Sequence, residues 1–266
     1  MRAIAVDWSG ATHTARSHIW LAEAIQPGQL LRLEAGRDRD ELCAHLLSLP
    51  TDGLVIGLDF AFSFPAWFLE HLGITSAADL WSHVTCHGEA WLAGCEPPFW
   101  GRPGRRRPTL ELPALRRTDR AVPSTSGIVP KSVFQVGGAG AVGTGSIRGM
   151  PLLRRLHAHG AAIWPFTTGG TPILVEIYPR LLTGPVHKSQ RSARSDLLAA
   201  RYPDLGSGHR ELAVASEDAF DAAVSALVMI DYGADLTTLP TEANSILRME
   251  GRIWHPRWRE DRLYAR

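Results

Sequence analysis

Two short apolar runs, each ending in an aspartate, organise the first part of the chain: Arg2-Ala-Ile-Ala-Val-Asp7 and Gly53-Leu-Val-Ile-Gly-Leu-Asp59. The second run is apolar at nearly every position, as is typical of a strand buried on both faces at the centre of a mixed or parallel sheet. A carboxylate at the end of such a strand loses solvation unless something positive meets it. The two runs therefore predict the centre of a sheet and, at their ends, an edge that carries charge.

The residues between these runs predict a meander and a helix. Residues 17–24 are strand-like, Pro27-Gly28 marks a turn, and residues 29–34 return as a third strand. Asp38 or Asp40 then caps a helix, and the run 54–59 is the fourth strand. In this order the first and fourth strands can pair as neighbours, which would place Asp7 beside Asp59.

The periodicity weakens after Ala61 and becomes regular again near Ile173. We expect a fifth strand over 173–178 and one domain over 1–266, with a large insertion at about 61–170 between strands four and five. The fold class is α/β, with a five-stranded mixed sheet flanked by helices. Helices are predicted near 65–72, 77–93, 150–159, 192–201 and 216–230, a strand at 132–136 is an option, and the tail 236–266 is left unassigned.

Composition limits the kinds of partner. The chain has 266 residues, with 28 basic against 27 acidic side chains and a formal charge of +1, so contact with a polyanion would need a local basic patch. Three cysteines without a fourth ligand at finger spacing argue against zinc. No signal peptide or membrane-spanning run is visible, so we expect a soluble cytoplasmic protein; the oligomeric state is left open.

Three further acids join Asp7 and Asp59 as candidates for chemistry. Glu176 lies in the fifth strand, and Asp218 and Asp221 open the helix 216–230 on one face. Several carboxylates at one place repel each other and favour a divalent cation, so Mg²⁺ or Mn²⁺ is the expected cofactor. The candidate catalytic residues are Asp7, Asp59, Glu176, Asp218 and Asp221.

Each acid also has a purely structural interpretation. Asp7 precedes Trp8-Ser9-Gly10 and can be a turn carboxylate, whereas Asp218 can be stabilised by the helix dipole alone. Glu176 can form an ordinary ion pair with Arg180 or Lys188. Asp59, between a buried strand and the aromatic run Phe60–Pro65, most needs a partner.

A Pro/Arg-rich segment at 97–131 is either a solvated loop or a basic arm that contacts phosphates. The candidate substrate-binding residues, here and later in the chain, are Arg106, Arg107, Lys131, Arg180 and Lys188. Gly138, Gly140 and Gly143 match the spacing G-x-G-x-x-G, but no acid ends a strand about 20 positions later, so a flexible or anion-facing loop is favoured over a dinucleotide site.

Several segments together resemble a family of prokaryotic proteins known only as domain of unknown function number 429, described as predicted nucleases with an RNase H-like fold. They include Val6-Asp-Trp-Ser-Gly10, Gly57-Leu-Asp-Phe-Ala-Phe-Ser-Phe-Pro65, Lys131-Ser-Val-Phe-Gln135, Val175-Glu-Ile-Tyr-Pro-Arg180, Asp218-Ala-Phe-Asp-Ala222 and Glu250-Gly-Arg-Ile253. The resemblance implies an RNase H-like sheet. The resolvase branch of that superfamily also ends in a D-x-x-D helix, which implies that Asp7, Asp59 and Asp221 are metal ligands and Asp218 a fourth.

Three functions follow as alternatives. The first is a metal-dependent nuclease that hydrolyses phosphodiester bonds in DNA or RNA. The second is an actin-like small-molecule kinase or ATPase, with Asp7–Thr12 as a phosphate loop. The third is a non-catalytic binding protein whose acids hold a structural ion or pair with arginines and whose surface tryptophans, Trp8, Trp254 and Trp258, contact a partner.

Overall fold

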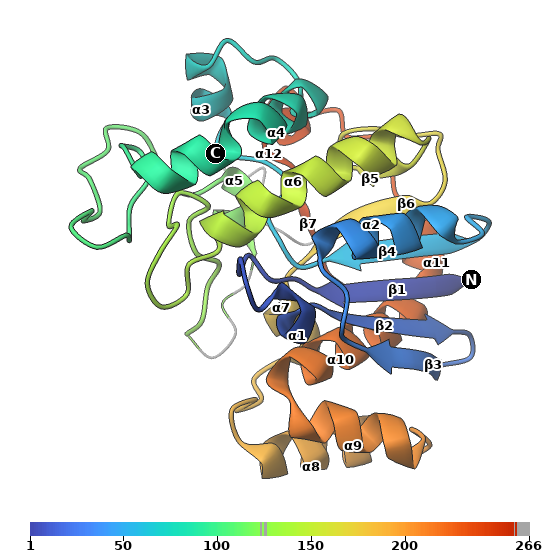
Figure 1. Ribbon diagram of the computed structural model, residues 1–266. Coiled ribbons are helices and arrows are strands. Elements are labelled where there is room, and N and C mark those ends of the chain that lie inside the picture. The colour runs from blue at the N-terminus through green and yellow to red at the C-terminus, as the bar shows by residue number, and fades with distance from the viewer. Residues whose placement is uncertain (123, 125–126, 258, 260–266) are drawn as a thin grey trace.

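A seven-stranded mixed sheet forms the centre of the computed structural model, which describes residues 1–122, 124, 127–257 and 259 (Figure 1). The strand order is β3 (Gln29–Glu34), β2 (Trp20–Ile25), β1 (Arg2–Asp7), β4 (Leu54–Leu58), β6 (Ile173–Ile177) and β5 (Ala162–Trp164), and β7 (Ile253–Trp254) also pairs with β6.

The pairing of the central strands places their carboxyl ends together. Strand β1 is antiparallel to β2 but parallel to β4, and β4 is parallel to β6. In this register Val6 is opposite Leu58, and Leu58 is opposite Glu176. Asp7 and the residue after β4, Asp59, therefore lie at the same edge of the sheet.

Helices cover both faces of the sheet. On one face lie α2 (Arg39–Ser48), α4 (Ala77–Gly94) and α6 (Gly143–Ala158), which share a hydrophobic core with alternate residues of β1 and β4. The other face packs on α10 (Glu217–Asp231), beside α7 (Pro179–Thr183), α8 (Arg191–Arg201), α9 (Ser207–Ala215) and α11 (Gly233–Thr237). The remaining short helices are α1 (Ala15–His18), α3 (Ala66–His71), α5 (Arg117–Ala121) and α12 (Ser245–Glu250).

Small side chains let α10 approach the sheet closely. Ala3 and Ala5 of β1 and two alanines of β2 face the alanine-rich helix, whereas Ile4 and Val6 face α2 and α6. A Cβ atom at Gly57 would lie 2.7 Å from Met229 Sδ, so even one methyl group has no room there. The helix begins near the carboxyl edge of the sheet and ends beside Met1, whose Sδ would lie 2.5 Å from a Cβ at Gly233.

All five predicted strands are present, but the predicted number of strands was too low. Strands β5 and β7 have three and two residues, too short to produce a periodic signal. Residues 17–18 belong to α1 rather than to a strand, and 132–136 form a turn joined to Trp100 by one β-bridge. Of the two predicted caps of α2, Asp38 and Asp40, the structure has Asp38, which forms a capping box with Glu41.

The insertion and the tail differ most from expectation. Helix α6 begins at Gly143, seven residues before the predicted start, because glycines at its first turn hide the helical pattern. The unassigned tail contributes α11, α12 and β7; its residues 258 and 260–266 lie outside the described residues. Within the described part of the chain, no helix is long and apolar enough to cross a membrane.

Candidate functional site

Three aspartates converge at the carboxyl edge of the sheet, from β1, from the end of β4 and from the first turns of α10. Desolvation raises the pKa of Asp7 well above its ordinary value, and the charges of Asp59 and Asp221 raise it further. Desolvation, followed by the charge of Asp221, raises the pKa of Asp59 to about 8. Each carboxylate thus makes the others harder to ionise, as like charges in a poorly solvated place must.

One lysine is the nearest positive charge to this carboxylate group, which we define as Asp7, Asp59 and Asp221. Lys188 Nζ donates a hydrogen bond to Asp221 Oδ2. Burial alone would lower the pKa of Lys188, but the adjoining Asp221 outweighs that effect and raises it. Arg194 holds the backbone of this lysine: its Nη1 donates to the Lys188 carbonyl, and its Nε and Nη2 donate to the Val214 carbonyl.

The carboxylate group is left short of partners. Asp221 is 3% exposed, and its Oδ1 has no hydrogen-bond partner among the residues that the structure describes. Within the same residues, the side chains of Asp7 and Asp59 form no hydrogen bond or ion pair. When all three acids are ionised, one ammonium leaves two negative charges uncompensated, which matches the charge of one divalent cation.

The donor set also suits such an ion, since magnesium and manganese prefer carboxylate oxygens. The arrangement is not a ready-made shell, however: among the described residues, no group of three or more His, Cys, Asp or Glu side chains could hold a metal ion as it stands. Charge and ligand chemistry therefore fit a divalent cation, whereas tight coordination would require rotation of these side chains.

Asp218 lies at the rim of the group. Its Oδ2 is 3.0 Å from His18 Nδ1, and its side chain is 35% exposed. Its charge still contributes to the raised pKa of Asp7 and of Asp59, as expected for the residue one turn before Asp221 on the same helix.

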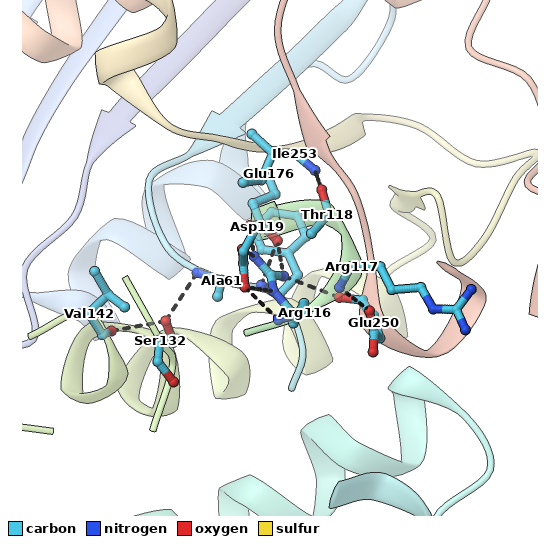
Figure 2. Close-up of polar contacts among 12 residues, drawn as sticks. Ala61, Arg116, Arg117, Thr118, Asp119, Ser132, Val142, Glu176, Glu250 and Ile253 are labelled. Carbon is cyan, nitrogen blue, oxygen red and sulfur yellow. Dashed lines mark hydrogen bonds and ion pairs between the residues drawn. The ribbon is translucent and has the colours of Figure 1, made fainter. Parts of the chain in front are cut away.

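The ion-pair partner of Glu176 differs from the two that the sequence suggested. Its partner is neither Arg180 nor Lys188 but Arg116, which reaches it from the insertion and is 1% exposed (Figure 2). Glu176 Oε2 also accepts a hydrogen bond of 2.9 Å from the Phe62 amide. Although burial raises the pKa of Glu176, these bonds stabilise its charged form.

The guanidinium of Arg116 is fully bonded. Nε and Nη2 donate to Asp119, Nη1 and Nη2 donate to Glu176, and Nη1 also donates to the Glu250 carbonyl. Five N–H donors thus make five bonds, which is all that an arginine can make. Glu250 itself accepts from the backbone amides of Ala66 and Arg117. We call Arg116, Asp119, Glu176 and Glu250 the arginine network; Glu176 belongs to it and, with Arg116 and Asp119, also lines the larger of the two cavities described below.

The other predicted basic residues divide into two sets. Lys131 lies at the cavity described below, whereas Arg107 stacks over Trp100, 5.2 Å from the ring centre, and Arg106 is exposed and lines neither of the cavities at Asp59. Arg180 lines the smaller of those cavities; its Nη1 donates to the Val186 carbonyl, and its buried Nε lacks a partner among the described residues. The Pro/Arg-rich segment therefore brings Lys131, Arg102 and Arg116 to the site but not Arg106 or Arg107.

Two cavities open beside Asp59. The larger has a volume of about 580 Å³ and the smaller of about 320 Å³, and Asp59 and Tyr178 line both. Desolvation raises the pKa of Tyr178, and the charge of Asp59 adds to this effect. One wall of the larger cavity is the loop after β1, where Arg148 Nη1 donates to the Gly10 carbonyl and to Thr12 Oγ1.

The glycine run has a packing explanation. A Cβ atom at Gly137 would lie 2.4 Å from the Gly101 carbonyl oxygen, and one at Gly143 would lie 2.2 Å from the Val133 carbonyl oxygen. At Gly10, a Cβ would meet the Gly145 backbone nitrogen at 2.5 Å. Gly143 therefore allows backbone segments to touch, whereas Gly138 and Gly140 adopt positive φ angles of 78° and 73°, which favour glycine, so the G-x-G-x-x-G spacing needs no nucleotide to account for it.

The residues that sequence reasoning missed are arginines with structural duties. Arg116, Arg148 and Arg194 each bond to backbone carbonyls or buried acids near the site, and nothing in their sequence spacing distinguishes them from solvated arginines. The signal in the sequence was Glu176, which lies in a predicted strand followed by Tyr178-Pro179. A glutamate in a buried strand needs a positively charged partner.

Comparison with protein-family models, with curated proteins and with solved structures gives no significant match. The chemistry of the site therefore has to be argued from its own geometry.

Proposed function

We propose that this protein is a divalent-cation-dependent phosphodiesterase, a nuclease on an RNase H-like fold, and that Asp7, Asp59 and Asp221 form its reaction centre. The observation that carries the proposal is the unbalanced charge of the carboxylate group: three acids from three separate elements meet at one sheet edge, beside a single lysine and with Asp221 Oδ1 unpartnered.

Each residue has a distinct part in this proposal. Asp7, Asp59 and Asp221 would hold the cation, with Asp218 contributing from the rim. When bound, a divalent cation neutralises charge on a phosphate and lowers the pKa of a water molecule. Lys188, a point charge carried on a flexible stem, would bind a non-bridging phosphate oxygen once the cation replaces it beside Asp221.

The order of the strands and helices also supports the proposal. A meander of β1 to β3, a helix, β4 and then β6 after an insertion agrees with the RNase H-like order that the family resemblance implies. That resemblance also points to the same three aspartates. Because one fold can carry many chemistries, the charge of the site weighs more than the topology.

The two alternative functions find less support. An actin-like kinase would use the glycine run or the loop after β1 for nucleotide phosphates, yet Gly10 and Gly145 are pressed against each other. A binding protein would present its tryptophans, but Trp8 and Trp254 are buried, and Trp258 lies outside the described residues. Nor are Asp7 and Asp59 paired with arginines in the described part of the chain.

The direct test is calorimetric titration of Mg²⁺ and Mn²⁺ into the wild type and the Asp7→Asn/Asp59→Asn variant, followed by cleavage assays on labelled DNA and RNA. The matched control is Asp52→Asn, the same substitution at an exposed residue before β4, at the opposite end of that strand. We expect metal binding and cleavage in the wild type and the control, and neither in the double variant. Equal cleavage by all three proteins would refute the assignment.

A further inference from the structure

The space around Asp59 is suited to a small unit of substrate. Both cavities fall within the range of about 300–1,000 Å³ that small-molecule sites occupy, at about 580 and 320 Å³. Because Asp59 and Tyr178 line both cavities, a phosphate at Asp59 would have one cavity on each side of it.

The insertion covers this edge of the sheet. Pro130, Lys131 and Ala141 line the larger cavity opposite the loop after β1, and Ile128 lines the smaller one opposite Lys188. In Figure 1 the green loops of the insertion lie beyond the carboxyl ends of β1 and β4. Recognition of a duplex typically buries about 1,000–2,500 Å² of strongly basic protein surface, whereas this chain has a formal charge of only +1 and its cavities lie beside the insertion.

The positively charged side chains that line the cavities are suited to binding phosphate groups. The chain has only two lysines, and each lines one of the two cavities: Lys131 the larger and Lys188 the smaller. Lys131 and the neighbouring Arg102 are exposed, and their side chains form no hydrogen bond or ion pair with other described residues. Small apolar side chains, among them Ala61, Ala141 and Val142, leave room between these charges for a planar base.

We propose that the substrate is an unpaired strand bound as a dinucleotide unit, with its scissile phosphodiester at Asp59, one nucleoside in the larger cavity and the adjoining one in the smaller. The reaction itself rests on the proposed function. In it, the water oxygen bonds to phosphorus as one phosphorus–ester oxygen bond breaks. One water proton passes to the leaving hydroxyl, and the other passes to solvent as the new phosphate monoester ionises.

The first test compares substrates. A single-stranded oligonucleotide, a dinucleotide and the same sequence within a blunt hairpin duplex are incubated with the wild type and Mg²⁺. A fourth substrate, methyl 4-nitrophenyl phosphate, is a phosphodiester that needs only the reaction centre. We expect kcat/KM for the two unpaired substrates to exceed that for the duplex at least about tenfold, the scale on which pocket contacts discriminate. Activity on the oligonucleotide but not on the dinucleotide would show that two nucleosides do not suffice for binding, and would overturn the dinucleotide unit. Equal cleavage of the duplex would overturn the inference.

The second test alters the larger cavity without touching the carboxylate group. Ala141→Phe fills the cavity and Lys131→Glu reverses its charge; Arg154→Glu, an exposed residue of α6 outside both cavities, is the control for charge. We expect the first two variants to lower dinucleotide kcat/KM about tenfold or more, and by a larger factor than they lower hydrolysis of methyl 4-nitrophenyl phosphate, which has no second nucleoside. An equal loss of both activities, in variants whose circular dichroism and Tm are those of the wild type, would contradict a separate nucleoside cavity.

A binding measurement separates this inference from the proposed reaction. Reductive ¹³C-methylation keeps the lysine charges and gives resolvable NMR signals for Lys131, Lys188 and the amino terminus, with Lys→Arg variants to assign them. A non-hydrolysable methylenephosphonate dinucleotide, added in the presence of Mg²⁺, should shift both lysine signals relative to Mg²⁺ alone. Both shifts without hydrolysis of any substrate would uphold the dinucleotide site and refute the reaction. Hydrolysis of methyl 4-nitrophenyl phosphate without either shift would refute the dinucleotide site alone.

Discussion

Two groups of acids lie at the same edge of one sheet, and they differ in how completely they are bonded. In the arginine network, Glu176 accepts from two nitrogens of Arg116 and from the Phe62 amide, and all five donors of Arg116 are used. In the carboxylate group, by contrast, the described part of the chain supplies only Lys188 as a partner, and it provides no donor for Asp221 Oδ1.

This difference in bonding distinguishes acids that stabilise the fold from acids that we propose to take part in the reaction. A buried charge with a full set of partners is stable as it stands, and removing a partner is costly. A buried charge that lacks partners destabilises the folded protein unless a ligand supplies them, and such groups gather at functional sites. We therefore expect the two groups to respond oppositely when a charge is removed.

The largest effect should come from breaking the arginine network. Arg116→Met removes the partner of Glu176 and Asp119, and loss of one member of a buried ion pair typically costs about 3–5 kcal/mol. Urea unfolding of the variant measures the change. A free energy of unfolding within about 1 kcal/mol of the wild type would show that the network is not structural.

Asp59→Asn should have the opposite signature, with activity lost and metal-free stability gained. Cleavage should fall by about 10²–10³-fold or more, the loss typical of removing one group that stabilises a transition state. The protein should remain folded, because the substitution removes a carboxyl group whose ionisation is opposed by burial and by the other aspartates. Unchanged cleavage would remove Asp59 from the reaction centre.

The same variant should change the pH dependence of stability in EDTA. Since the pKa of Asp59 is raised to about 8, the folded wild type keeps a proton that the unfolded chain releases near pH 3.8. This contribution to stability is complete below pH 3.8 and is lost as pH rises to about 8. Unfolding measured between pH 5 and 8.5 should show a weaker decline for Asp59→Asn, and identical slopes would contradict the raised pKa.

Divalent cations should stabilise the wild type at the carboxylate group but not through the arginine network. At a concentration 100 times the Kd, Mg²⁺ binding to the folded state adds about 2.7 kcal/mol. Thermal unfolding with Mg²⁺ and then EDTA should show this shift in the wild type and lose it in Asp7→Asn/Asp59→Asn. A shift of equal size in the double variant would place the ion elsewhere.

The smallest effect concerns the lysine that stands beside Asp221. Lys188→Met removes a positive charge that competes with the ion, so Mg²⁺ should bind more tightly by about tenfold, or about 1.4 kcal/mol. Cleavage should nevertheless fall, because the proposed phosphate contact is lost. Calorimetry and kcat measure the two effects, and weaker metal binding would show that Lys188 organises the carboxylates instead.

The extent to which this site could be predicted depended on the periodicity around each residue. Asp7 and Asp59 end continuous apolar runs, and parallel pairing of those runs brings them together, so both the fold centre and the two acids could be predicted. Asp221 followed from its position one turn after Asp218 on a clearly helical stretch.

Arg116 could not be predicted in the same way. It lies in a Pro/Arg-rich segment without apolar periodicity, where one buried guanidinium looks like its solvated neighbours. Its pairing with Glu176 spans 60 positions and depends on how the insertion folds back over the sheet. Long-range ion pairs of this kind leave no local pattern, and this is why Glu176 was grouped with the reactive acids.

The close packing of α10 on the sheet has a consequence for sequence change. Asp221 reaches Asp7 and Asp59 because alanines and Gly57 hold the helix near the strands. A larger side chain at any of these buried positions would move the helix outward and widen the spacing of the acids. We would therefore expect Ala5, Ala22 or Gly57 to tolerate substitution less well in a screen for activity than in one for solubility, although none of them can touch a substrate.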